Sequence, residues 1–212
     1  MVHLAFQEHR IKHGEEGRDP VSTMRATKEA IALLHLPCKE AQVLPGFGWR
    51  PPDEGFVKIN TDGGLNFEEG RGGAGGVARS PSALLGAWCK PYSGITDPLI
   101  MEGLSLRDGV RFATLRGFSH VIMEVDCLEL VTLWNSRHNS RSIVAYLLDE
   151  IGELSTYFTS FDICHVSRST NLPAHLCDKR ACALDVTDSW MEETPSFLLT
   201  SLLADSSKNA FR

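Results

Sequence analysis

The hydrophobic pattern of this chain changes period near residue 97, and that change constrains the fold more than any other feature. Before it, residues 56–61 alternate as a strand does, and residues 70–80 and 84–92 indicate two more strands joined by short Gly or Ser-Pro turns. After it, helices and apolar strands follow in turn: helix 97–117, strand 120–126, helices 128–135 and 142–158, strand 160–166 and helix 171–184. An antiparallel meander followed by crossovers predicts an α/β fold with a five-stranded mixed sheet flanked by helices.

The two ends differ in composition from this central part. Residues 1–48 are expected to form an N-terminal extension, with a helix over 22–36 that leads into a Pro/Gly-rich linker. Residues 49–184 would form the folded domain, and residues 185–212 a C-terminal tail with one short apolar segment, 197–203. A protein partner, if the chain has one, would bind the N-terminal helix or that apolar segment.

Composition limits the classes of protein to consider. Of the 212 residues 42% are apolar, which is enough for a buried core, and the formal net charge is −6. An acidic chain is a poor tight, non-specific binder of nucleic acid, but binding bridged by metal ions remains open. The six cysteines form no CxxC pair, and neither a secretory leader nor a membrane-spanning apolar run is visible. We therefore expect an intracellular protein, nuclear or cytoplasmic, with no membrane partner.

Three acidic residues each have a plain structural explanation when taken alone. Asp62 precedes two glycines, so it fits a tight turn as well as a ligand position. Asp126 ends an apolar strand, where it would either cap the next helix together with Glu129 or face a ligand at the sheet edge. Glu102 lies on the apolar stripe of helix 97–117, which is costly unless the carboxylate is paired, binds a cation or swings out to solvent.

Taken together, the three acids predict a metal site. If strands 56–62 and 120–126 are neighbours, Asp62 and Asp126 meet at one sheet edge, and the helix brings Glu102 over them. Clustered carboxylates repel one another, and a hard divalent cation such as Mg²⁺ relieves that repulsion. Two such ions activate a water molecule and stabilise the leaving oxygen of a phosphodiester.

Five motifs in order resemble one family. KINTDGG, the glycine-rich second strand, LIMEGLSLRDGV, VIMEVD and HVSRSTNLPAH look like the type 1 ribonuclease H fold over about residues 49–184. The resemblance is closest to ribonuclease H-like domains of plants, which are related to the C-terminal part of non-LTR retroelement reverse transcriptases. It implies a ribonuclease H-like fold and endonucleolytic hydrolysis of the RNA strand of RNA–DNA hybrids, with Mg²⁺, or alternatively Mn²⁺, as the cofactor.

The resemblance also implies site residues. Asp62, Glu102 and Asp126 match the first three acids of an Asp-Glu-Asp-Asp set, which are the expected metal ligands and catalytic residues. His175 stands where the family has its fourth acid, and His165 matches a proton-shuttling histidine, although it would equally well bond locally. Imidazole suits Mn²⁺ or Zn²⁺ better than Mg²⁺.

Further residues, near the last helix and on the Gly-rich strand, are expected to support the metal site or to contact nucleic acid. Asp178, one helical turn after His175, would partly replace the missing acid. The predicted nucleic-acid-binding residues are Gly63, Asn171 and Arg168, with Asn171 also explained as a helix cap. Other basic residues that would contact phosphates, or simply be solvated, are Arg71, Arg79, Lys179 and Arg180. A zinc set of His165, His175, Cys177 and Cys182 has no standard spacing.

The missing fourth acid leaves two functions open. The first is a metal-dependent nuclease with weakened activity. The alternative is a catalytically degenerate, retroelement-derived domain that binds nucleic acid or protein without cleaving it.

Overall fold

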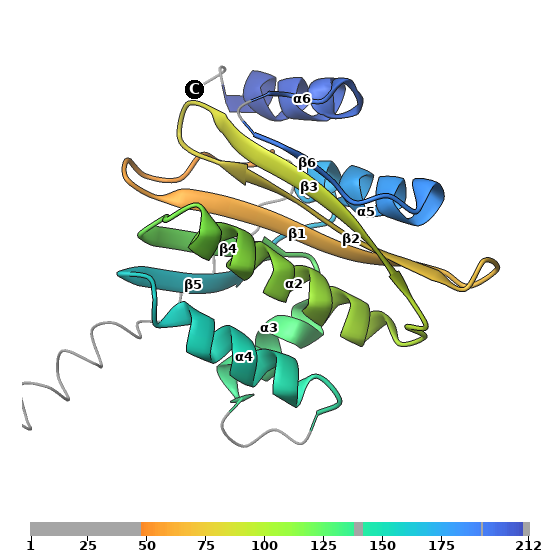
Figure 1. Cartoon of the computed structure of the whole chain (residues 1–212). Coiled ribbons are helices and arrows are strands. Elements are labelled where there is room, and N and C mark those ends of the chain that lie inside the picture. The colour runs from red at the N-terminus through yellow and green to blue at the C-terminus, as the bar shows by residue number, and fades with distance from the viewer. Residues whose placement is uncertain (1–47, 138–141, 192, 210–212) are drawn as a thin grey trace, which may run out of the picture. The chain divides into compact units, whose positions relative to one another are not determined.

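The computed structural model describes residues 48–137, 142–191 and 193–209, which are built around a six-stranded mixed sheet (Figure 1). The strands lie in the order β5-β4-β1-β2-β3-β6. Strands β4 and β5 run parallel to β1, whereas β2, β3 and β6 continue the sheet in antiparallel pairs. Their bounds are β1 Val57–Asn66, β2 Arg71–Arg79, β3 Leu84–Ser93, β4 His120–Val125, β5 Ser160–His165 and β6 Asp188–Trp190.

The predicted mixed α/β fold is confirmed, but the predicted number of five strands is wrong. The sixth strand, β6, comes from the segment expected to be a tail and pairs with Ala87, Trp88 and Cys89 of β3. Only three residues form it, so no alternating pattern in the sequence could mark it as a strand. The predicted boundaries between domain and tail, and between extension and domain, stay predictions.

Helices cover both faces of the sheet. They are α2 Pro98–Leu115, α3 Leu128–Asn135, α4 Ala145–Ser155, α5 Leu172–Leu184 and α6 Leu199–Asn209, with a short 3-10 turn η2 at Ser196–Leu198. Successive residues of a strand point to opposite faces. Gly63 lies against α2 and Gly64 against α5, so these two helices pack on opposite faces of β1. Figure 1 shows α3 and α4 on the side of α2.

Helix α2 begins where the sequence predicts it. The Asp97 carboxylate accepts hydrogen bonds from the backbone N–H groups of Leu99 (2.8 Å) and Ile100 (3.1 Å), which confirms Asp97 as the N-cap. Gly117 follows the last turn with φ of +67°, a conformation that glycine adopts at little cost. The main core cluster forms beneath this helix and includes Ile59, Leu106, Met123, Leu148 and Ile151, all fully buried.

The C-terminal segment packs closely on the sheet. Leu198 is fully buried in a second apolar cluster with Val77 and Cys177, whereas Leu199 and Leu203 stay 45% and 66% exposed. The apolar segment 197–203 is therefore partly used inside the fold. The predicted helix over 22–36 lies outside the described residues. Within the described ranges, no helix has both the length and the apolar character needed to cross a membrane.

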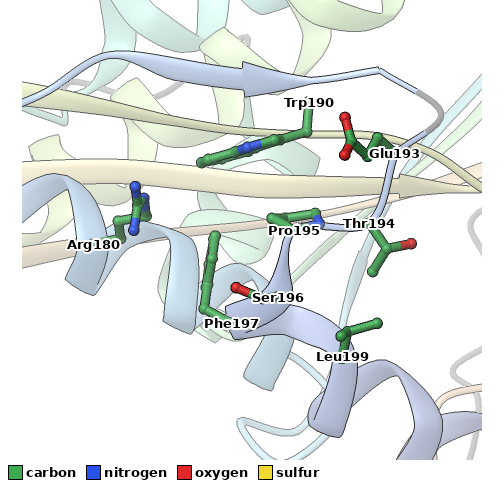
Figure 2. A pocket seen from close by; sticks show the side chains of 8 residues that line it. All are labelled: Arg180, Trp190, Glu193, Thr194, Pro195, Ser196, Phe197 and Leu199. Atoms are coloured by element: carbon green, nitrogen blue, oxygen red, sulfur yellow. The ribbon is translucent and has the colours of Figure 1, made fainter.

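A pocket of about 430 Å³ lies between α5, β6 and η2 (Figure 2). The rings of Trp190 and Phe197 meet edge to face with centroids 5.4 Å apart, and the Arg180 guanidinium lies within 5.5 Å of both centroids. Arg180 also forms an ion pair with Asp188 at 3.2 Å. The pocket therefore belongs to the docking of the C-terminal segment. Of the residues with a predicted role, Arg180 lines it, and none of the predicted catalytic or metal-binding residues does.

Candidate active site

The sheet register places two of the predicted acids side by side. Thr61 of β1 lies opposite Val125 in the parallel pair with β4, so the next residues, Asp62 and Asp126, are neighbours at the carboxyl edge of β4. Asp126 follows the end of β4, but Asp62 lies inside β1, which continues to Asn66. The expectation that the first strand ends at Asp62, and the turn interpretation of Asp-Gly, are wrong.

The glycines after Asp62 serve close packing. A Cβ added to Gly63 would meet the backbone carbonyl of Met101 in α2, and a Cβ on Gly64 would meet the carboxylate of Asp178 in α5. Two adjacent glycines therefore let two helices approach β1 from opposite faces, without breaking the strand. This approach is what brings side chains from α2 and α5 to Asp62.

Glu102 reaches the other two acids from α2. Its Oε2 atom is buried and has no hydrogen-bond partner among the described residues. Burial, and then the nearby charges of Asp62 and Asp126, raise the pKa of Glu102 to about 9. The helix thus holds a carboxyl group in a place where burial and neighbouring negative charges disfavour its ionised form.

Asp126 does not cap the helix that follows it. Cys127 is the N-cap of α3 and makes no side-chain capping bond, so the capping pair with Glu129 is not formed. The Asp126 carboxylate instead accepts a hydrogen bond from Asn171 Nδ2 at 3.3 Å. It is therefore directed toward the sheet edge that it shares with Asp62.

The three acids form a group that fits a divalent cation. Asp62, Glu102 and Asp126 each offer a carboxylate oxygen, and these atoms all lie within 4.8 Å of one another. Burial, and then the charge of Asp126, raise the pKa of Asp62, because the two neighbouring carboxylates repel each other when both are ionised. An all-oxygen ligand set with an unpartnered buried oxygen suits a hard ion such as Mg²⁺.

His175 joins Asp62 from α5. Its Nδ1 atom lies 2.8 Å from Asp62 Oδ2 and 3.1 Å from Asp178 Oδ1. These three residues make a second group of possible ligands, which shares Asp62 with the first. Burial, and then the charge of Asp62, raise the pKa of Asp178 to about 8. The cysteines of the considered zinc set belong to neither group in the described part of the chain.

The remaining predicted residues have different surroundings. Asn171 is fully buried and donates through Nδ2 to the Thr61 carbonyl (2.9 Å) as well as to Asp126. It stands at the start of α5 without a side-chain capping bond, so the cap explanation fails. Arg168 is exposed, and its charge lowers the pKa of Asp62 after the larger effects of the other neighbours. His165 is exposed at the end of β5 and belongs to neither group of ligands.

A buried polar network behind the acids was not predicted. Asn60 Nδ2 donates to Glu124 (2.9 Å) and to Asn171 Oδ1 (3.2 Å), and Asn60 Oδ1 accepts from Arg79 (2.7 Å). Arg79, expected either to contact phosphates or to be solvated, is only 4% exposed and pairs with Asp205 of α6 at 2.7 Å. The partners are up to 126 positions apart in sequence, so no local pattern could have revealed them.

Comparisons with known proteins agree with this architecture. A model of the family described as reverse transcriptase-like matches residues 60–181. Comparison with proteins of curated function gives no match. The N-terminal RNase H domain of rv2228c from Mycobacterium tuberculosis superposes with a TM-score of 0.56 at 21% identity, covering 61% of this chain and 94% of that one.

Two further solved structures have the same fold. RNase H1 from the archaeon Halobacterium salinarum gives a TM-score of 0.55 at 21% identity and covers 61% of this chain and 98% of its own. LC11-RNase H1, solved in complex with an RNA/DNA hybrid, gives 0.55 at 16% identity, with coverage of 61% and 98%. The expected ribonuclease H-like fold is thereby confirmed.

Proposed function

We propose, from the premise that the chain belongs to the reverse transcriptase-like family, that it is a cation-dependent endonuclease that hydrolyses the RNA strand of RNA–DNA hybrids. The single observation that carries the proposal is the convergence of Asp62, Glu102 and Asp126, with ligand atoms within 4.8 Å of one another. The unpartnered, buried Oε2 of Glu102 supports a cation there, because a fold seldom buries such an oxygen without a partner.

The chain's own residues hold this site in place. Asp62, Glu102 and Asp126 would bind Mg²⁺, which supplies charge neutralisation and an activated water when bound. Ser105 Oγ of α2 donates to the Asp62 carbonyl (2.7 Å) and fixes the backbone from which that carboxylate projects. Asn171 fixes Asp126 through its side-chain amide. The ligands are therefore preorganised by buried contacts.

Basic residues near the acids would contact the substrate. Arg168 and Lys179 are exposed close to the start and on the surface of α5, where a phosphate backbone bound at the acids would pass. Arg79 and Arg180 instead form ion pairs with Asp205 and Asp188, respectively, so we do not assign them to the substrate. With a net charge of −6, affinity for a polyanion would depend strongly on the bound cations.

A cleavage assay tests the proposal. The purified chain is incubated with end-labelled RNA–DNA hybrid in Mg²⁺ and separately in Mn²⁺, with duplex DNA and single-stranded RNA as controls. We expect hybrid-specific cleavage that Asp126→Asn lowers by about 100-fold or more, because the ligand-held cation supplies several kcal/mol of transition-state stabilisation. Asp149→Asn, at an exposed aspartate of α4, is the matched control and should cleave normally. Undiminished cleavage by Asp126→Asn would overturn the proposal.

A second candidate function is binding of hybrid without hydrolysis. It is favoured by one observation: His175 stands where an Asp-Glu-Asp-Asp set has its last acid, and its Nδ1 lies 2.8 Å from Asp62 Oδ2. A hydrogen bond there would occupy an oxygen that the cation needs. In that case the folded wild-type chain shifts labelled hybrid in a gel but leaves it uncut in both Mg²⁺ and Mn²⁺.

A further inference from the structure

A fully buried asparagine, Asn60, lies two residues before Asp62 on β1. Successive residues of a strand point to opposite faces, so Asn60 and Asp62 project from the same face. The parallel register pairs Asn60 with Glu124 of β4, which lies two positions before Asp126. Asparagine is uncommon inside strands, and a buried amide is costly unless its polar atoms are hydrogen-bonded. Both polar atoms of Asn60 have partners, and one of these partners leads to the acids.

Two charged groups fix the direction in which the Asn60 amide points. The Arg79 guanidinium carries only donors, so the Asn60 atom that lies 2.7 Å from it is the acceptor Oδ1. On the other side, Asn60 Nδ2 donates to the Glu124 carboxylate at 2.9 Å. Glu124 is itself held by Lys58 Nζ (2.7 Å) and Trp49 Nε1 (3.0 Å). A donor on one side and an acceptor on the other leave the amide a single orientation.

The orientation of Asn60 determines that of Asn171. The second Nδ2 proton of Asn60 is donated to Asn171 Oδ1 at 3.2 Å. Asn171 must therefore turn its Nδ2 group the other way, toward the Thr61 carbonyl (2.9 Å) and Asp126 Oδ1 (3.3 Å). In the reverse orientation, Asn171 Oδ1 would face two acceptor oxygens, and its Nδ2 would face the Nδ2 of Asn60. Donors and acceptors thus alternate in one direction from Arg79 to Asp126.

We propose that Asn60 is a positioning residue for the cation ligand Asp126 and acts through the amide of Asn171. The inference deepens the proposed function and rests on it, since Asp126 is taken to bind the cation. A donor with a fixed orientation restricts the rotation of the Asp126 carboxylate before the cation binds. Hydrogen-bond partners that orient a metal ligand contribute about 10- to 100-fold to the affinity of the site.

Titration calorimetry of Mg²⁺ into the metal-free full chain tests the proposal without reference to cleavage. Asn60→Leu has nearly the same size but cannot donate to Asn171, so we expect it to weaken Mg²⁺ binding by about tenfold or more. Asn171→Ala should have a similar effect. If Asn60 acts only through Asn171, the double variant Asn60→Leu with Asn171→Ala binds Mg²⁺ no more weakly than Asn171→Ala alone.

A destabilised control variant separates positioning from a general loss of stability. Asp205→Ala removes the carboxylate that pairs with Arg79 but leaves both hydrogen bonds that orient Asn60. We expect it to lower the free energy of unfolding and yet to bind Mg²⁺ as tightly as the wild-type chain. Circular dichroism confirms that each variant is folded at the temperature of the titration. If Asn60→Leu does not fold, Asn60→Asp replaces it, because an ionised carboxylate has the shape of the amide but no proton to donate.

Hydrogen exchange at the side chain of Asn171 gives a measurement that needs no cation. In a chain labelled with nitrogen-15 asparagine, both Nδ2 protons of the buried Asn171 are hydrogen-bonded and should exchange slowly with deuterated solvent. In Asn60→Leu we expect this exchange to become about tenfold faster or more, relative to the backbone amides of β4. A variant that is merely less stable would speed the exchange of both kinds of amide together.

The outcomes for Asn60 and for the proposed function are distinguishable. Mg²⁺ binding that is unchanged in Asn60→Leu, losses that add up in the double variant, or an equally large loss in Asp205→Ala would each overturn the inference. None of these results depends on whether the wild-type chain cleaves hybrid. If the wild-type chain binds no Mg²⁺, the proposed function fails, and the exchange at Asn171 decides the inference: faster exchange in Asn60→Leu supports it, and unchanged exchange overturns it.

Discussion

The ion pair between Arg79 and Asp205 yields the sharpest stability prediction. Both side chains are nearly buried, 5% and 7% exposed, and the pair ties α6 to the second strand. Asp205→Ala leaves the Arg79 guanidinium buried without its carboxylate, and burial already lowers the pKa of that group. Breaking a buried pair in this way costs about 3–5 kcal/mol.

Other contacts of Arg79 place the expected loss near the lower end of that range. The guanidinium also donates to Asn60 Oδ1 at 2.7 Å and stacks 3.5 Å from the ring centroid of Trp49. We therefore expect Asp205→Ala to lower the free energy of unfolding by about 3 kcal/mol, and the melting temperature by about 6–12 °C for a chain of this size. Urea denaturation followed by circular dichroism measures the first quantity, and calorimetry the second.

Two controls test the reasoning behind that number. Glu150→Ala breaks the exposed pair with Arg111, whose side chains are 32% and 50% exposed, and should cost less than about 1 kcal/mol. Arg79→Met combined with Asp205→Leu should recover most of the loss, because no charge then stays buried. A double variant as unstable as Asp205→Ala, or a loss of under about 1 kcal/mol in Asp205→Ala itself, would refute the assignment to an uncompensated charge.

Two further predictions concern packing and protonation. Gly75→Ala places a Cβ against Cys177 and the backbone of α5, so it should destabilise the fold by about 1–3 kcal/mol. Gly152→Ala lies in an open stretch of α4 and should stabilise the fold by about 0.5–1 kcal/mol. Urea denaturation compares the free energies of unfolding of the two variants. With pKa values of about 9 and about 8, Glu102 and Asp178 keep protons in the folded chain that the unfolded chain releases. The free energy of unfolding in chelator should therefore fall from pH 5 to pH 9, by up to about 1.4 kcal/mol per pH unit for each of the two groups. Saturating Mg²⁺ should remove much of that fall, and a profile that is flat in chelator would contradict the assignment.

Much of the fold follows from local signals in the sequence. The cap at Asp97 and the apolar stripe of α2 are properties of neighbouring residues, so the helix and the position of Glu102 on it were predictable. The proximity of Asp62 and Asp126 followed from the rule that parallel strands place their carboxyl ends at one edge.

The wrong predictions, the turn at Asp62 and the helix cap at Asn171, have a common physical cause in long-range packing. Asp-Gly at residues 62–63 has the local preference of a turn, but the approach of α2 and α5 uses the glycines as space inside a strand. Asn171 occupies a capping position, yet its amide is drawn to Thr61 and Asp126 across the sheet. Such partners lie more than 40 positions away in sequence, beyond the reach of any local rule.

The short strand β6 has a practical consequence for anyone who shortens this chain. A fragment cut to the family-matched segment, residues 60–181, would lose the strand that pairs with Ala87–Cys89 and the helix that neutralises Arg79. It would expose an unpaired strand edge beside a bare apolar surface, which is a template for edge-to-edge aggregation. A fragment for expression should therefore extend beyond α6, and precipitation of a shorter one would be explained by its unpaired strand edge rather than by a failure of the ribonuclease H-like fold.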